Sequence, residues 1–172
     1  METEELVMDM HYDKAPAFCM LIFDHRNSVS KKLVGNDRLI DTLMFSDNQA
    51  KEIYATFGNS ALVVKNGDEF IKRVERTFLA QGITFTRGRV NYYDQNYLQH
   101  FREINENGYR IAFWKKEIFE YQQEYRIFAF ETEVDDHLEV DIGDLSDITM
   151  IISKEQALDL CLEIEYSVKE KV

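Results

Sequence analysis

Residues 113–130 constrain the fold more than any other stretch of this chain, because they concentrate large apolar side chains. Seven residues of this stretch are aromatic, and Trp114 is the only tryptophan of the sequence. The second half, Tyr125 to Phe130, is a short run rich in aromatic and β-branched residues. Such a run is typical of a buried strand. We therefore expect a central strand here, with the rest of the chain packed around it.

Polar residues stand directly before this strand. Glu120, Gln122 and Glu124 share parity, so they would lie on one face at the mouth of the strand if extended backbone begins that early. A partly exposed carboxylate there can bind a sugar hydroxyl or stabilise an oxocarbenium-like centre when a glycosidic or nicotinamide bond breaks. Glu124 and Gln122 are therefore the candidate catalytic residues. An ordinary transition from loop to strand has the same composition, and that interpretation stays open.

The order of strand and helix patterns indicates the fold class. Apolar runs and period-two alternation predict strands over residues 6–12, 17–23, 61–64, 83–86, 89–93, 137–142 and 148–152. Helical spacing predicts helices between residues 35 and 44 and over 48–57, 69–81 and 154–168, and residues 94–107 form a polar helix or an ordered loop. Because strands and helices do not alternate strictly, we expect an α+β fold. The chain, residues 1–172, is expected to form a single domain with a mixed or antiparallel sheet flanked by helices.

Both cysteines lie in apolar segments. Cys19 belongs to the run 17–23, and Cys161 falls on the apolar stripe of the predicted last helix, which Ser153 and Gln156 begin as a capping box. We therefore expect two buried, unreactive thiols in a reducing compartment. No spacing of metal ligands occurs in the sequence, so no metal is expected.

The net charge of −12 is concentrated in the last third of the chain. Residues 117–172 carry 4 basic and 16 acidic side chains, whereas residues 1–116 carry 16 of each. An acidic surface repels phosphate backbones, so direct nucleic-acid binding is disfavoured there. The surface either keeps the protein soluble or binds a basic protein partner. The expected partner-binding residues crowd one predicted turn: Glu131, Glu133, Asp135 and Asp136.

Neither a membrane span nor a secretory signal is expected. No apolar run approaches the roughly 20 residues that a membrane-spanning helix needs. The first residues are acidic, which a secretory signal is not. We therefore expect a cytoplasmic protein.

Several short motifs resemble a widespread bacterial domain family of unsettled activity. The resemblance covers roughly residues 89–152. It consists of Arg89-Val90-Asn91-Tyr92-Tyr93-Asp94, Phe113-x-Lys115, Phe119-x-Tyr121-x-x-Glu124-Tyr125-Arg126 and Asp141-Ile142-Gly143 with the strand that follows. In this chain Gln122 stands where that family has its first glutamate, or that glutamate is offset by one residue.

The segment Gln122-x-Glu124 also resembles the loop that carries the catalytic glutamate of ADP-ribosyltransferases. That resemblance implies that Glu124 binds the nicotinamide ribose of NAD and that Gln122 addresses the acceptor. It further implies a histidine or arginine on an earlier strand, for which His25 and Arg26 are candidates, and Arg126 could pair with a phosphate.

Two function hypotheses follow from different classes of protein. The first is an ADP-ribosyltransferase-like enzyme that uses NAD, acting in conflict between bacterium and phage. The second is a non-catalytic acidic protein that inhibits a partner by covering a basic, nucleic-acid-binding surface.

Overall fold

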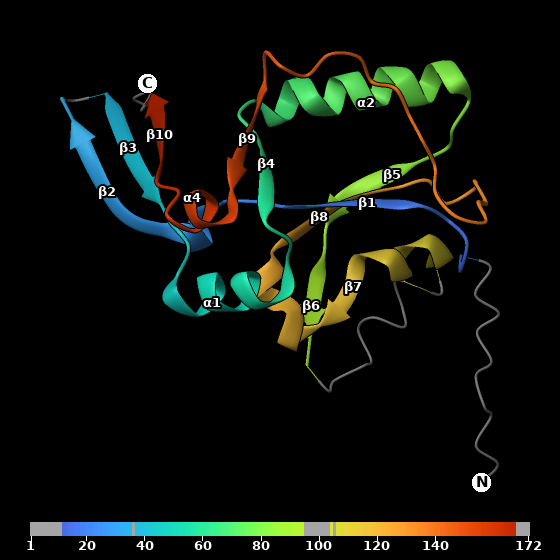
Figure 1. Cartoon of the computed structure of the whole chain (residues 1–172), viewed down its shortest axis with the longest axis horizontal. Helices are drawn as coiled ribbons and strands as arrows, with labels where there is room; N and C mark the ends of the chain where they lie inside the picture. Colours follow the sequence, from blue (N-terminus) through green and yellow to red (C-terminus); the bar gives the residue numbers. More distant parts are fainter. Residues whose placement is uncertain (1–11, 36, 95–103, 105, 168–172) are drawn as a thin grey trace, which may run out of the picture.

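The computed structural model describes residues 12–35, 37–94, 104 and 106–167, and its elements form an α+β arrangement of several small sheets (Figure 1). The central strand is β8 (Glu124–Phe128), and β1 (Ala17–Leu21), β5 (Thr86–Arg89) and α2 (Gly67–Gln81) pack around it. The predicted fold class is confirmed.

The central sheet has the order β1-β8-β5, and both neighbours run antiparallel to β8. The strand expected at residues 125–130 is therefore the middle strand, although it begins at Glu124 and ends at Phe128. Ile127 and Phe128 are each only 3 % exposed, so the aromatic run occupies the core as predicted.

The two faces of this sheet pack against different elements. Ile127 packs with Phe70, Val74 and Phe78 of α2 in the main apolar cluster. Glu124, Arg126 and Phe128 alternate with that set and so lie on the opposite face. On that second face Phe128 meets Phe113 of the 3-10 helix η2 (Gly108–Phe113). Figure 1 shows α2 on one side of the sheet and η2 with β7 (Trp114–Lys116) on the other.

Helix α2 follows its sequence signals closely. The Asn66 side chain accepts a hydrogen bond from the Glu69 N–H at the helix start. Gly82 ends the helix in the left-handed region at φ 69°, where glycine is favoured because it lacks a Cβ. The buried residues Phe70, Val74 and Phe78 recur every four positions, so one stripe of the helix covers the sheet.

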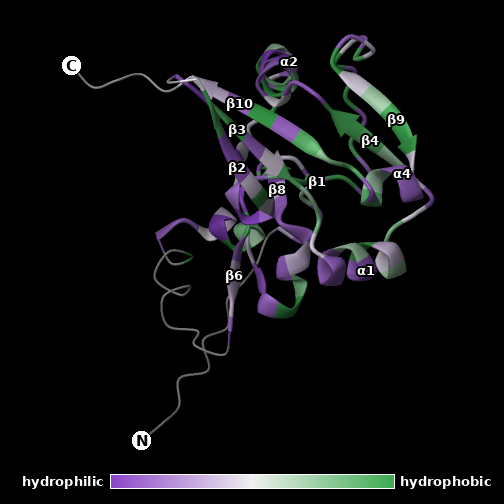
Figure 2. Ribbon diagram, turned by 90° about the vertical axis from the view of Figure 1, so that its left-hand side faces the viewer, coloured by the Kyte–Doolittle hydropathy of each residue, from purple (hydrophilic) through white to green (hydrophobic). Residues whose placement is uncertain are grey.

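Three further small sheets surround this core. Strand β3 (Arg38–Leu43) lies between β2 (Ser28–Val34) and β10 (Leu162–Ser167), and β4 (Ser60–Val64) pairs with β9 (Thr149–Ser153). Strand β6 (Asn91–Tyr93) pairs in parallel with β7. The helices α1 (Asp47–Thr56) and α4 (Lys154–Leu158) flank β4, and Figure 2 shows apolar residues along β4 and alternating character along β10.

Two helix predictions are wrong. Between residues 28 and 43 the chain forms the hairpin β2–β3, which turns at Gly35 with φ 69°. The predicted last helix stops at Leu158, although its capping box of Ser153 and Gln156 is present. The chain then becomes β10, because Leu162 and Ile164 alternate with acidic residues and their backbone bonds the edge of β3.

The remaining differences concern bends and short irregular segments. The strand predicted over residues 83–86 is wrong, because β5 begins only at Thr86 and continues to Arg89, and β6 follows after Val90 with a different partner strand. Residues 137–142 form no regular strand, yet the predicted alternation is present because Leu138, Val140 and Ile142 pack against the core. The strand predicted over residues 6–12 and the segment 94–107 lie largely outside the described residues.

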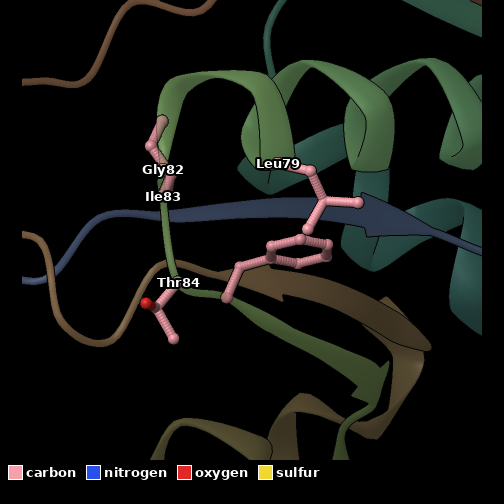
Figure 3. A pocket seen from close by; sticks show the side chains of 5 residues that line it. Leu79, Gly82, Ile83 and Thr84 are labelled. Carbon is pink, nitrogen blue, oxygen red and sulfur yellow. The ribbon is translucent and has the colours of Figure 1, made fainter.

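A hollow of about 320 Å³ lies at the end of α2 (Figure 3). Leu79, Ile83 and Phe85 give it an apolar lining, together with Gly82 and Thr84. Phe85 stacks edge-on against Phe78, so the hollow belongs to the α2 side of the sheet. It contains no titratable side chain and is not part of the site described below.

Adjacent residues of α2 provide a test of this packing. Phe78→Ala should lower the free energy of unfolding by about 3–5 kcal/mol, because it removes a buried ring from the main cluster. Leu79→Ala should change it by less than about 0.5 kcal/mol, because Leu79 is 74 % exposed. Urea denaturation measures both variants. Equal losses would show that α2 is rotated relative to the sheet.

Candidate functional site

Charged side chains gather where β1 and β5 end and β8 begins. Glu124 is the first residue of β8, Arg89 is the last residue of β5, and Asp24 follows β1. The backbone joins these ends, because the Ile22 N–H bonds the Gln123 oxygen and the Val90 N–H bonds the Glu124 oxygen. We call this group, with the partners described next, the strand-end cluster.

The first half of the cluster surrounds the carboxylate of Glu124. Lys115 of β7 donates to Glu124 Oε1 and also to Gln122 Oε1. Arg126 donates from Nε to Glu124 Oε2 at 2.8 Å and from Nη1 to the backbone oxygen of Ala112. Glu124 is only 8 % exposed, so both of its oxygens are bound within the protein interior.

These contacts keep Glu124 ionised at neutral pH. Burial raises the pKa of a carboxyl group, but the hydrogen bonds and charges of Lys115 and Arg126 outweigh burial and lower the pKa of Glu124 below its ordinary value. The carboxylate is therefore suited to stabilising positive charge and not to donating a proton. The expectation of a partly exposed Glu124 is wrong, because it is buried in these ion pairs.

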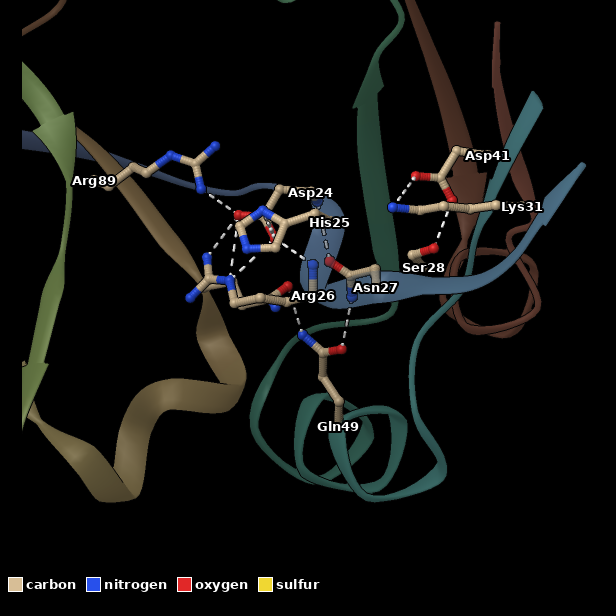
Figure 4. Close-up of polar contacts among 10 residues, drawn as sticks. Asp24, His25, Arg26, Asn27, Ser28, Lys31, Asp41, Gln49 and Arg89 are labelled. Carbon is tan, nitrogen blue, oxygen red and sulfur yellow. Dashed lines mark hydrogen bonds and ion pairs between the residues drawn. The ribbon is translucent and has the colours of Figure 1, made fainter. Parts of the chain in front are cut away.

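The second half of the cluster surrounds Asp24 (Figure 4). Arg26 donates from Nε and Nη2 to the Asp24 carboxylate at 3.0 and 2.9 Å, and Arg89 also donates to it. Burial raises the pKa of Asp24, but the Arg26 side chain and N–H, with Arg89, hold it far below its usual range. The Arg89 side chain is itself 54 % exposed, so it stays accessible to solvent while it pairs with Asp24.

Tyr92 lies between the two halves. Its hydroxyl accepts a hydrogen bond from the Glu124 N–H at 2.9 Å. Burial raises the pKa of Tyr92. The Glu124 charge raises this pKa further, and the charges of Arg126 and Arg26 lower it. The two halves are therefore neighbours, although their residues come from separate parts of the chain.

Only some of the residues predicted from sequence meet in this cluster. Gln122 and Glu124 share Lys115, but not through strand alternation as expected. Instead the 3-10 helix η3 (Glu117–Gln122) ends at Gln123, which has φ 42°, and this turn brings both side chains to the lysine. Glu120 is exposed, although its charge still acts on Arg26.

The candidate NAD-binding residues separate into two kinds. Arg26 and Arg126 belong to the cluster. The His25 side chain is 79 % exposed, and its Nδ1 lies 3.9 Å from the Asp24 carboxylate. Sequence reasoning did not assign roles to Asp24, Arg89 or Lys115. The signals for them were that Asp24 directly follows the predicted strand 17–23 and that Arg89 and Lys115 belong to the segments that carry the family resemblance.

The acidic residues proposed for partner binding lie on a separate loop. Glu131, Glu133, Asp135 and Asp136 are all exposed. Asp135 pairs with Lys14 at 2.7 Å, and His137 contacts the carboxylates of Asp136 and Glu139. Acids thus face solvent along this loop.

Among the described residues, no group of three or more histidine, cysteine or acidic side chains is placed to hold a metal ion. Within the same part of the chain, no helix has the length and apolar character needed to cross a membrane. Comparisons with protein families, with curated proteins and with solved structures found no match to this chain. The two family resemblances therefore remain predictions.

Neighbouring lysines test the ion pair of Glu124. Lys115→Met should lower the free energy of unfolding at pH 7 by about 1–3 kcal/mol, because a buried carboxylate loses one cation. The pKa of Glu124 is lowered in the folded protein, so this stabilisation is present above its ordinary value of 4.5 and is lost as the pH falls through the folded value. The difference between the proteins should therefore shrink in acid. Lys116→Met, at the exposed neighbour, is the control. A pH-independent difference would mean that only packing was lost.

The cysteines offer a second test, since both are exposed and the prediction of buried thiols is wrong. The Cys19 residue is exposed by its surface area, yet partial burial of its thiol raises the pKa, with the Arg126 charge opposing this shift. Because the thiolate is the reactive form, Cys161 should react first with a thiol reagent in the native protein. Cys161→Ser should remove the fast phase. A fast phase that persists in this variant would assign it to Cys19.

Proposed function

We propose that the strand-end cluster binds a phosphorylated nucleotide, with NAD as the first candidate, and that Glu124 assists cleavage of its bond between nicotinamide and ribose. The observation that carries this proposal is the local charge balance. Four cations, those of Arg26, Arg89, Lys115 and Arg126, surround two buried carboxylates. The exposed Glu120 adds a third negative charge near Arg26, so one positive charge is in excess. This excess of positive charge occurs in a protein of net charge −12, and it favours an anionic ligand.

The arginines suit phosphate in particular. A guanidinium presents a planar fork of N–H donors that matches phosphate oxygens. Arg89 donates to Asp24 while its side chain remains about half exposed. The Arg26 side chain is 33 % exposed. A phosphate seated here would meet both side chains without displacing the Asp24 carboxylate that orients them.

The ionised state of Glu124 supports the choice of NAD. In this reaction the bond between nicotinamide and ribose breaks, and its electron pair leaves with neutral nicotinamide. Positive charge then develops on the ribose, and an ionised carboxylate stabilises such a centre. Water or a nucleophile of the target takes the ribosyl group and releases a proton. Gln122 shares Lys115 with Glu124 and is the candidate residue that faces this acceptor.

Calorimetric titration tests the binding step with NAD, ADP-ribose and inorganic pyrophosphate as probes. Arg89→Met should weaken binding of each about tenfold or more, because it removes a charge-assisted contact. Arg87→Met is the matched control, because Arg87 lies on the same strand but pairs with Glu75 of α2. Equal affinities for the two variants, or no binding by the wild-type chain, would contradict the proposal.

Release of nicotinamide tests the catalytic step. Incubation of the full chain with NAD should give free nicotinamide, measured by chromatography, and Gln122→Leu should change how that release divides between water and an added acceptor. Glu124→Gln should abolish release, although it also leaves Lys115 and Arg126 without their shared carboxylate and so destabilises the fold. Tight binding of ADP-ribose without any turnover of NAD would support the proposed binding site but contradict the proposed enzymatic activity.

A second candidate function is favoured by the acidic loop, which we define as residues 131–141. Its acids are exposed while Val134, Leu138 and Val140 are partly buried. One side of the loop therefore presents negative charge, as a surface that covers a basic partner would. Charge of this kind speeds association with a basic partner and is screened over about 8 Å at physiological salt.

Changing Glu133, Asp135 and Asp136 together to the neutral amides tests this candidate. Association with an immobilised lysine-rich peptide should slow and become less dependent on salt, with little loss of stability because these side chains are exposed. The control removes the same charge elsewhere, by neutral amides at Glu155, Asp159 and Glu163, which are also exposed. Identical salt slopes for the two triple variants would assign the effect to net charge alone.

A further inference from the structure

Two helices of this chain begin with the same four-residue pattern but use it differently. Helix α4 begins at Ser153-Lys154-Glu155-Gln156, and α1 begins at Ser46-Asp47-Asn48-Gln49. In α4 the Gln156 side chain accepts from the Ser153 N–H at 2.9 Å, which completes a capping box. In α1 the Ser46 side chain caps the Gln49 N–H, but the Gln49 side chain turns away to distant partners.

Those partners lie next to the two halves of the strand-end cluster, and Figure 4 shows the bond from Gln49 to Asn27 on the Asp24 side. Gln49 Oε1 accepts from Asn27 Nδ2 at 3.0 Å, and Asn27 Oδ1 accepts from the Asp24 N–H. Gln49 Nε2 donates to the Tyr121 oxygen at 2.8 Å and to Gln123 Oε1 at 3.0 Å. The hydrogen-bonded amides of Asn27, Gln49 and Gln123 therefore connect Asp24 with the turn directly before Glu124.

The amide network is buried throughout. Asn27, Gln49 and Gln123 are 4 %, 7 % and 7 % exposed. A buried amide that loses its partner costs about 1–3 kcal/mol, so each group must keep its partner. Gln123 also has a left-handed backbone at φ 42°, which is uncommon for a residue with a side chain and persists only where the surroundings fix it.

We infer that Gln49 is a positioning residue for the strand-end cluster, setting the turn at Gln123 and the loop at Asp24 relative to each other. Gln49 contacts none of the four cations in its hydrogen bonds. It acts on the ligand through the residues it holds, so this inference rests on the proposed function. Its effect on the geometry of Glu124 exists without any ligand and can be measured separately.

Gln49→Met tests the inference, with Gln156→Met as the matched control at the same position of the other helix. Carboxyl NMR titration of the ligand-free protein should show the pKa of Glu124 moving toward its ordinary value in Gln49→Met, because the turn no longer holds Glu124 against Lys115. Gln156→Met should leave that pKa unchanged. Calorimetry should show ADP-ribose binding weakened about tenfold by the first variant and unchanged by the second.

A second variant keeps the test decisive if Gln49→Met does not fold. Gln123→Gly removes one amide partner of Gln49, while glycine accepts the left-handed backbone readily. It should shift the pKa of Glu124 in the same direction by a smaller amount.

Each remaining outcome has one meaning. An unchanged pKa of Glu124 in the folded variants would overturn the positioning role and leave Gln49 as a stabilising residue only. If wild-type protein binds no ADP-ribose but Gln49→Met shifts the Glu124 pKa, the proposed function fails and the positioning of Glu124 by Gln49 stands.

Discussion

The burial of two carboxylates at one end of the central sheet is the constraint on which the rest of the site depends. An ionised carboxylate removed from water costs several kcal/mol unless cations and hydrogen bonds replace its hydration. Asp24 and Glu124 obtain these partners from β5, β7 and β8 and from the loop after β1. The elements on both sides of the sheet end must therefore meet at this point, and packing of β7 against η3 is part of that requirement.

The same requirement explains why the site is polar but ordered. Cations outnumber the buried acids, and the buried amides of Asn27, Gln49 and Gln123 fill the space between the two halves. A network of this kind has little tolerance for a missing partner, because each unsatisfied amide would remain buried. The strand-end cluster and its buried amides therefore supply both the positive charge that would bind a ligand and the hydrogen bonds that fix the backbone.

The outer sheet β10-β3-β2 has a different physical character. Among the described residues, β2 and β10 are its outer strands and carry like charges, Lys31 and Lys32 on β2 and Glu163 and Glu165 on β10, although Lys31 pairs with Asp41 and Glu165 with Arg38 within the sheet. Two copies of either edge would bring these like charges together, which opposes pairing of strands between molecules. The apolar residues of β10 alternate with its acids, so the strand joins β3 without presenting a wholly apolar edge.

The sequence by itself determined the elements whose signals are local. The stripe Phe70, Val74 and Phe78 with its caps specified α2, and the apolar runs specified β1, β4, β8 and β9, because these patterns depend on neighbours along the chain. Residues 157–168 carried both helical and period-two spacing, and only pairing with β3 decided for β10. The cluster required Arg89 to meet Asp24 across 65 residues of sequence, and it required the ends of β1 and β5 to bring that pair next to Glu124 and Lys115. Such contacts are decided by the tertiary structure, because a charged residue at a strand end looks the same in sequence whether it faces water or a buried carboxylate.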